Sequence, residues 1–234
     1  MQAAAIALLI ICYCTAGYLA WRQQSPIYLL VIVSGHLSAL AAPLWRLLYG
    51  VNSGVSLGSV LAALTQPAPM PLILVAGWHY PLPAMLVFYL YLTRWWFPGS
   101  ISGTLTYLIF LFYHLLIELV GLRTSLWSYR EISLPMGLPS PLLAAVMAGL
   151  ISYATLYVLL STYRYAWFSM AMVIIPSVLL VSVLTHGLLG APLWIALALN
   201  GANWAMTIGT ISALALLLWA IQIITGGIRR VDEG

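Results

Sequence analysis

The most informative residues of this sequence are a histidine and a glutamate one helical turn apart, His114 and Glu118. They lie inside the apolar stretch from Tyr107 to Gly121, in a chain of which 5% of the residues are charged. A carboxyl group at bilayer depth is energetically costly, so it indicates a functional site. At a spacing of four residues the two side chains share one helix face and can exchange a proton, as general acid–base catalysis requires.

An acid in dry, aromatic-lined surroundings suits proton-initiated chemistry on an apolar polyene. Aromatic ring faces stabilise positive charge by about 0.5–2 kcal/mol per contact. A carboxyl group without a close cation favours its protonated form and can supply the proton. The pattern therefore predicts a membrane-embedded enzyme that cyclises or isomerises a lipid-soluble isoprenoid or terpenoid substrate, with Glu118 as the acid and His114 as its proton partner.

Further polar and aromatic groups are predicted to lie at similar depth in neighbouring helices and to line a substrate pocket with this pair. Asn200 and Asn203 begin a stripe at helical spacing that continues through Thr207 and Thr210. The residues predicted to bind substrate are His79, Trp78, Tyr80, His36, Asn200, Asn203, Trp204, Arg46 and Arg123.

These residues also have a purely structural interpretation. A single histidine in a membrane helix often makes one interhelical hydrogen bond, which applies to His36 and His186. Stripes of Asn and Thr commonly serve as packing contacts between helices. Glu118 could be the ion-pair partner of an arginine that folds in from a loop, either Arg46 or Arg130.

The string from His114 to Glu118, His-Leu-Leu-Ile-Glu, resembles the His-x-x-x-Glu element of the emopamil-binding sterol isomerases. The resemblance covers five residues of one helix. Members of that family are membrane enzymes that move a double bond through a cationic intermediate, so the resemblance implies proton-driven isomerisation. The second acidic residue of the family's site has no counterpart that the sequence identifies here, and seven spans exceed the family's usual number.

Composition assigns the chain to the polytopic membrane proteins with an all-α helix bundle. Of its 234 residues, 64% are hydrophobic, and apolar runs long enough to cross a bilayer recur along its whole length. Residues 1–234 are therefore predicted to form a single transmembrane domain of about seven helices. The predicted spans are Ala3–Ala20, Ile27–Leu48, Leu72–Leu92, Thr104–Gly121, Leu142–Tyr163, Trp167–Leu189 and Trp204–Ile224.

Arginine placement predicts the orientation of these spans. An outside N-terminus and a cytoplasmic C-terminus put five arginines inside and three outside, as expected for a multi-pass protein of the cytoplasmic membrane. The scattered arginines argue against nucleic acid as a partner, and the absence of lysine excludes a retinal Schiff base. Residues 50–71 and 191–203 are apolar but short, which is typical of re-entrant or interfacial helices.

Nothing in the sequence requires a metal or another cofactor, and the expected partners are the lipid bilayer and a lipophilic small molecule. Two alternatives to an enzyme remain open. His79 and His114 lie at comparable depth and could ligate a b-type haem in a membrane electron carrier. The chain could also be a non-catalytic small-molecule binder or permease component, with Glu118 as the proton or substrate site. The oligomeric state is not predicted.

Overall fold

Helices make up almost all of the structure. The computed structural model describes residues 2–39, 41, 44–45, 48–49, 51–52, 77, 79–124, 128–129, 134–135, 138–199 and 203–231. The helices of this part are α1 (Gln2–Gln23), α2 (Ile27–Ala39), α6 (Pro81–Leu92), α7 (Ser100–Arg123), α8 (Ser140–Thr162), α9 (Trp167–Val183), the π-helix η2 (Leu184–Leu189), α10 (Ala191–Ala198) and α11 (Asn203–Val231). Strands β1 (Val51–Asn52) and β2 (Ser128–Tyr129) form one short antiparallel pair. The all-α prediction is confirmed at this level.

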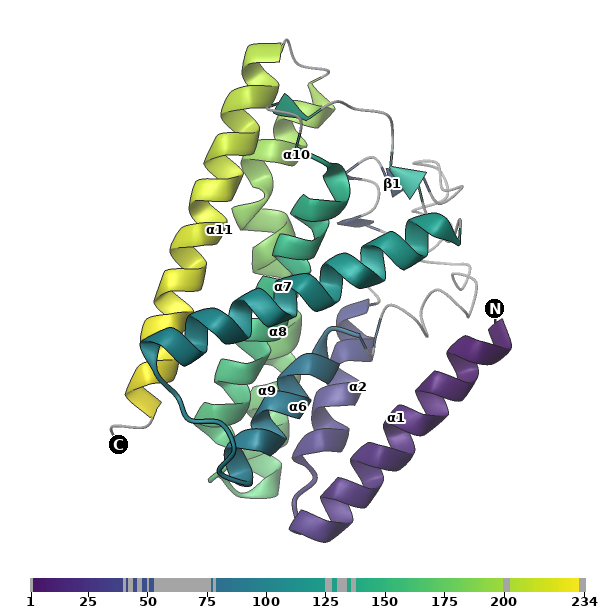
Figure 1. The fold of residues 1–234 in the computed structure, drawn as a ribbon, viewed down its shortest axis with the longest axis vertical. Coiled ribbons are helices and arrows are strands. Elements are labelled where there is room, and N and C mark those ends of the chain that lie inside the picture. Colours follow the sequence, from purple (N-terminus) through teal and green to yellow (C-terminus); the bar gives the residue numbers. More distant parts are fainter. Residues whose placement is uncertain are drawn as a thin grey trace.

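Helix α8 is the centre of the bundle. It packs against α6, α7, α9 and α11, and most of its side chains are buried. Figure 1 shows α7 crossing obliquely in front of α8, while α11 runs along one flank and α1 lies at the opposite edge. Helix α1 packs chiefly on α2, at the periphery of the bundle.

The outer surface of the bundle is suited to lipid. Four helices of the described part are long and apolar enough to cross a membrane: Ser100–Arg123, Ser140–Thr162, Trp167–Leu189 and Asn203–Val231. Large apolar side chains stay exposed along them, including Ile109, Phe112 and Trp219. A soluble protein would not expose such continuous apolar faces, whereas lipid makes them favourable.

The third predicted span differs from the structure. Its helix was expected to run through His79, but the described chain makes a turn at His79 and Tyr80, and α6 starts at Pro81. Proline has no N–H to donate and is favoured in the first turn of a helix, which explains why the helix begins there. The turn frees backbone groups of this segment for tertiary contacts. Residues 72–76 lie outside the described part.

The second predicted span and the two ambiguous segments are shorter in the structure than expected or lie partly outside its described part. The second span was predicted to reach Leu48, but α2 ends at Ala39. Of residues 50–71, only the strand β1 lies within the described part, so their predicted re-entrant helix stays a prediction. Residues 191–203 contain α10, whose 8 residues are too few to cross a bilayer.

A π-helix connects α9 to α10 and widens the helix around His186. The backbone N–H of Gly190 donates to the carbonyl of Thr185, five residues earlier. The carbonyl of His186 accepts the hydroxyl of Tyr49 at 2.6 Å, and the indole of Trp45 stacks on the His186 ring. These contacts give His186 a structural role, in which it anchors the segment after α2.

Close packing of α2 on the start of α6 positions the turn at His79 and gives a stability prediction. A Cβ at Gly35 would collide with the carbonyl oxygen of Gly77 and the ring of Pro81, whereas a Cβ at Gly17 of α1 meets nothing within 4 Å. We expect Gly35→Ala to destabilise the protein by about 1–3 kcal/mol through overpacking. The thermal unfolding midpoint in detergent micelles measures this effect.

The matched control is Gly17→Ala, which has the same chemistry on an open helix surface. It is expected to leave the midpoint unchanged or raise it slightly, because alanine is favoured over glycine within a helix. A midpoint for Gly35→Ala at or above that of the unmodified protein would contradict the packing described for α2 and α6.

Candidate functional site

The close contact between α7 and α8 brings His114 against Ser152. Gly149 allows this approach, because a Cβ there would lie 3.3 Å from the backbone nitrogen of Leu111, tighter than most van der Waals contacts. One turn further along each helix, Nε2 of His114 lies 2.6 Å from Oγ of Ser152. His114 is 1% exposed and Ser152 is fully buried, so the hydrogen bond is shielded from water.

Ser152 makes two further contacts that fix the direction of this hydrogen bond. Its Oγ lies 2.7 Å from the carbonyl oxygen of Tyr80 and 3.2 Å from that of Ala148. A carbonyl oxygen only accepts, so the single hydroxyl proton of Ser152 must point at one of these carbonyls. Ser152 therefore accepts from His114, and the ring proton of His114 lies on Nε2.

The consequence is a defined tautomer of His114. In the neutral ring with its proton on Nε2, Nδ1 carries a lone pair and can only accept. That nitrogen is buried and has no hydrogen-bond partner among the described residues. An unsatisfied buried acceptor costs about 1–3 kcal/mol and calls for an explanation, which a bound molecule would provide. The arrangement makes His114 a positioned proton acceptor.

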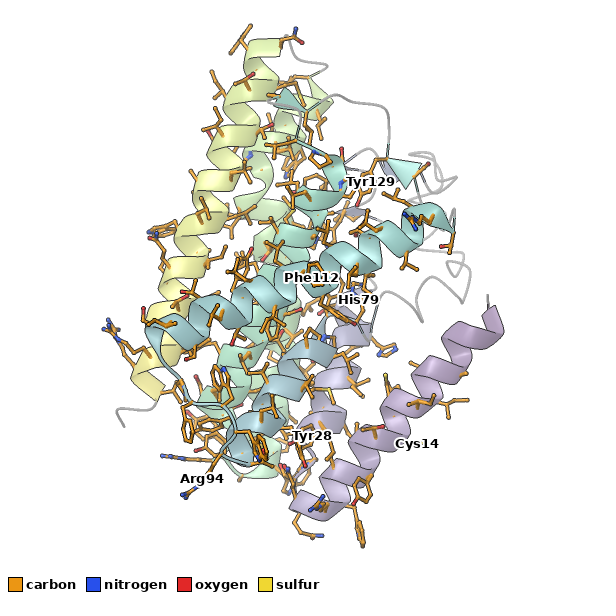
Figure 2. All side chains as sticks on the ribbon, viewed as in Figure 1. Cys14, Tyr28, His79, Arg94, Phe112 and Tyr129 are labelled. Atoms are coloured by element: carbon orange, nitrogen blue, oxygen red, sulfur yellow. The ribbon has the colours of Figure 1, made fainter. Side chains whose placement is uncertain are left out.

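Aromatic rings pack around the imidazole of His114. The ring centroid of His114 lies 5.0 Å from that of Tyr113, 5.4 Å from that of His79 and 5.7 Å from that of Tyr80. We call these four residues together with Ser152 the His114 cluster. Figure 2 shows His79 beside α7. The sequence prediction that His79, Tyr80 and His114 lie near one another agrees with this geometry.

The same geometry does not favour haem ligation by His79 and His114. Their rings contact each other edge to face, at a centroid distance of 5.4 Å. Two axial histidines of a haem lie on opposite faces of the porphyrin, which must fit between them. Nε2 of His114 is also committed to Ser152. The two histidines therefore form one packed pair with no room for the macrocycle between them.

Glu118 has a different environment, at the end of α7 that faces the strand pair. The hydroxyl of Tyr129 donates to its Oε2 at 2.6 Å. Tyr129 is held by the pairing of β2 with β1, in which Tyr129 lies opposite Val51. Figure 2 shows Tyr129 near the C-terminal half of α7. The segment after α7 therefore places Tyr129 directly on Glu118.

No hydrogen bond joins His114 to Glu118 in the described structure, so proton exchange between them stays a prediction. Their described hydrogen-bond partners are Ser152 for the histidine and Tyr129 for the glutamate. They are one helical turn apart, about 6 Å along the axis of α7. One bound molecule of modest size can contact a proton donor and a proton acceptor separated by this distance.

The structure places the other predicted residues as follows. His36 of α2 is half-buried, with Nδ1 2.9 Å from the carbonyl of Ile32, and its ring packs against Tyr13 and Gly77. Arg123 is exposed at the last residue of α7. The predicted substrate-binding residues that lie outside the described part are Trp78, Asn200 and Arg46.

The stripe on the last helix does not line the His114 cluster. Asn203 and Trp204 are exposed at the start of α11, Trp204 by 68%. The hydroxyl of Thr207 donates to the carbonyl of Asn203, and that of Thr210 to Met206, so both bond within their own helix. Among the described residues these hydroxyls bond within their own helix, so the packing interpretation of the stripe as contacts between helices stays a prediction.

Sequence reasoning missed Ser152, Tyr113 and Tyr129. Ser152 is one small residue in a long apolar helix, and its role depends on a contact with a residue 38 positions away. Tyr113 directly precedes His114, and its Oη is a second buried polar atom without a partner in the described part of the chain. The position of Tyr113 next to His114 is the only sequence signal that could have identified it.

Together, the apolar helices and the buried polar cluster define a helical membrane protein. Within the described residues, no group of three or more His, Cys, Asp or Glu side chains gathers to hold a metal ion. No family model, no curated protein and no solved structure matches this chain. The function must therefore be inferred from the site itself.

Proposed function

We propose that the protein is a membrane-embedded enzyme that isomerises or cyclises a lipid-soluble isoprenoid-type molecule by acid–base chemistry. The observation that carries the proposal is the buried Nδ1 of His114, a proton acceptor whose tautomer is fixed by Ser152 and which has no partner in the described structure. Positioned bases of this kind are typical of catalytic sites.

In the proposed reaction Glu118 and His114 have opposite roles. Glu118 donates its proton to a substrate double bond, which forms a C–H bond and leaves a cation at the adjacent carbon. The rings of Tyr80, Tyr113 and His79 surround the cation, and ring faces stabilise positive charge. His114 then removes a proton from a neighbouring carbon through Nδ1, which forms the new double bond. Proton return from His114 to Glu118 resets the site.

The proposed membrane topology has seven spans, an outside N-terminus and a cytoplasmic C-terminus. Five of the six described arginines support it, because they lie at or just after the last residues of α1, α6, α8 and α11, helices whose ends share one side of the bundle. Figure 1 shows the ends of α1, α8 and α11 at that side, and Figure 2 shows Arg94 there. These arginines are Arg22, Arg94, Arg164, Arg229 and Arg230. A positive end is expected to remain in the cytoplasm.

The experiment that tests the proposed function is a turnover assay in deuterated water. The purified full-length protein in lipid nanodiscs is supplied with isoprenoids of different chain length and headgroup. We expect an isomer of one of them, carrying one deuterium per turnover from the acid. Recovery of every compound unchanged and free of deuterium would contradict the enzyme proposal and favour the non-catalytic binder.

A further inference from the structure

A second buried ring nitrogen near the His114 cluster is also an acceptor without a donor. Nδ1 of His36 lies 2.9 Å from the carbonyl of Ile32, which can only accept, so the ring proton of His36 lies on Nδ1. In the neutral ring, Nε2 then keeps a lone pair. That atom is buried and has no hydrogen-bond partner within the described part of the chain, like Nδ1 of His114.

The two histidines flank one short segment of backbone. A Cβ at Gly77 would lie 2.7 Å from the imidazole of His36, and His79, two residues later, contacts the ring of His114. The hydroxyl of Tyr113, which can donate or accept, is a third buried group without a partner among the described residues. The groups on which the inference rests are thus two ring nitrogens that accept in the neutral tautomers assigned above, and one hydroxyl.

A site of this kind distinguishes ligands that donate a hydrogen bond from ligands that only accept one. A ligand hydroxyl can donate to a bare ring nitrogen, whereas a carbonyl or ether oxygen would bring a second lone pair against it. Sites that hydrogen-bond a substrate hydroxyl reject analogues lacking the donor, because the buried acceptor is then left unpaired. The chemistry of the site therefore calls for a donor on an otherwise apolar molecule.

We infer that the substrate carries a hydroxyl group that donates its proton to Nδ1 of His114, so that the site takes isoprenoid alcohols in preference to the corresponding aldehydes and ethers. The inference deepens the proposed function and rests on its assignment of the His114 cluster as the substrate site. The hydroxyl holds the molecule on Nδ1 of His114 in the bound ground state and leaves that nitrogen when the cation forms, so that the same lone pair can then take the proton from carbon. The apolar chain extends among the aromatic rings.

A protonated amine is also a donor, but the charges of the site favour a neutral group. Burial of an ammonium requires a counter-charge. Glu118 is the only acidic residue in the described part of the chain, and its Oε2 already accepts from Tyr129 at 2.6 Å. The His114 cluster itself contains no carboxylate. A neutral hydroxyl satisfies Nδ1 of His114 without this cost.

The test is equilibrium binding of matched ligands to the full-length protein in nanodiscs of zwitterionic lipid. The ligands are farnesol, farnesal, farnesyl methyl ether and farnesylamine, together with the geranylgeranyl compounds of the same four types. We expect the alcohol to bind about tenfold or more tightly than the aldehyde and the ether of the same chain. Equal binding of the three, preference for the amine, or binding of none would overturn the inference.

Ser152→Ala gives a sharper test, because it removes the acceptor that holds the proton on Nε2 of His114. The ring can then carry its proton on Nδ1 and donate to a carbonyl, so the preference for alcohol over aldehyde is expected to fall to about threefold or less. The control Ser161→Ala removes an exposed hydroxyl of α8 that bonds only within its helix, and it is expected to keep the preference.

An unchanged preference in a folded Ser152→Ala protein would overturn the role of the tautomer. If Ser152→Ala misfolds, the ligand series on the wild-type protein still tests the inference, because that series needs no variant. Binding and turnover are measured separately. Selective binding of alcohols without deuterium incorporation would contradict the enzyme proposal alone, whereas turnover without alcohol preference would contradict this inference alone.

Discussion

Replacement of His114 by glutamine is expected to lower the turnover of the isoprenoid substrate by about 10²–10⁴-fold, the usual contribution of a positioned general base. The amide nitrogen of glutamine can still donate to Ser152, so the contact between α7 and α8 that Nε2 makes at 2.6 Å is retained. What the variant lacks is a basic nitrogen that can take a proton from the substrate. Initial rates in nanodiscs measure the effect.

His186→Gln is the matched control for this prediction. It replaces another buried histidine, one that bonds to the carbonyl of Ser182 and stacks on Trp45 rather than contacting the His114 cluster. A lower unfolding midpoint is acceptable for this control, but the turnover of the folded protein should remain. Wild-type turnover by a folded His114→Gln protein would contradict the role of His114 as the base.

Replacement of Glu118 by glutamine is expected to reduce turnover by a similar factor of about 10²–10⁴, because the amide cannot supply a proton. Glutamine keeps an oxygen that accepts the hydroxyl of Tyr129, so the contact with β2 survives. We therefore expect the unfolding midpoint to change little while kcat falls. The rate constant and the midpoint, measured on the same preparation, separate catalysis from stability.

Tyr129→Phe distinguishes the two interpretations of Glu118. If the glutamate serves only as a structural anchor for the strand pair, Tyr129→Phe should destabilise the protein and lower turnover at least as much as Glu118→Gln, because Glu118→Gln keeps the acceptor and Tyr129→Phe removes the donor. If Glu118 is the acid, Tyr129→Phe changes turnover far less than Glu118→Gln. Equal turnover by Glu118→Gln and the unmodified protein would contradict the acid assignment and leave the glutamate with a structural role.

The helical class and the chemical importance of α7 could be predicted from the sequence. The class follows from composition, since long apolar runs with few charges are stable as helices in lipid. The importance of α7 follows from a single acidic residue within such a run, with histidine at i−4. Both signals are local, so they need no knowledge of which helices become neighbours.

The hydrogen-bond partners could not be predicted, because each depends on contacts between distant segments. Ser152 reaches His114 through a close helix crossing that Gly149 permits. Tyr129 reaches Glu118 through a strand pair of two residues on each side, which is too short to leave a periodic pattern. The turn at His79 had a local signal in Pro81, but the continuous apolar run favoured an uninterrupted helix.

The tautomer of His114 is the claim on which the acid–base site and the ligand preference both depend. Nitrogen-15 NMR of histidine-labelled protein in bilayers reports the proton on each ring nitrogen directly. The chain has 4 histidines, so the signals that disappear in His114→Gln identify this residue. We predict a protonated Nε2 and an unprotonated Nδ1 for His114 in the ligand-free protein. A proton on Nδ1, whether alone or together with one on Nε2, would contradict the assignment of Nδ1 of His114 as the proton acceptor of the ligand-free protein.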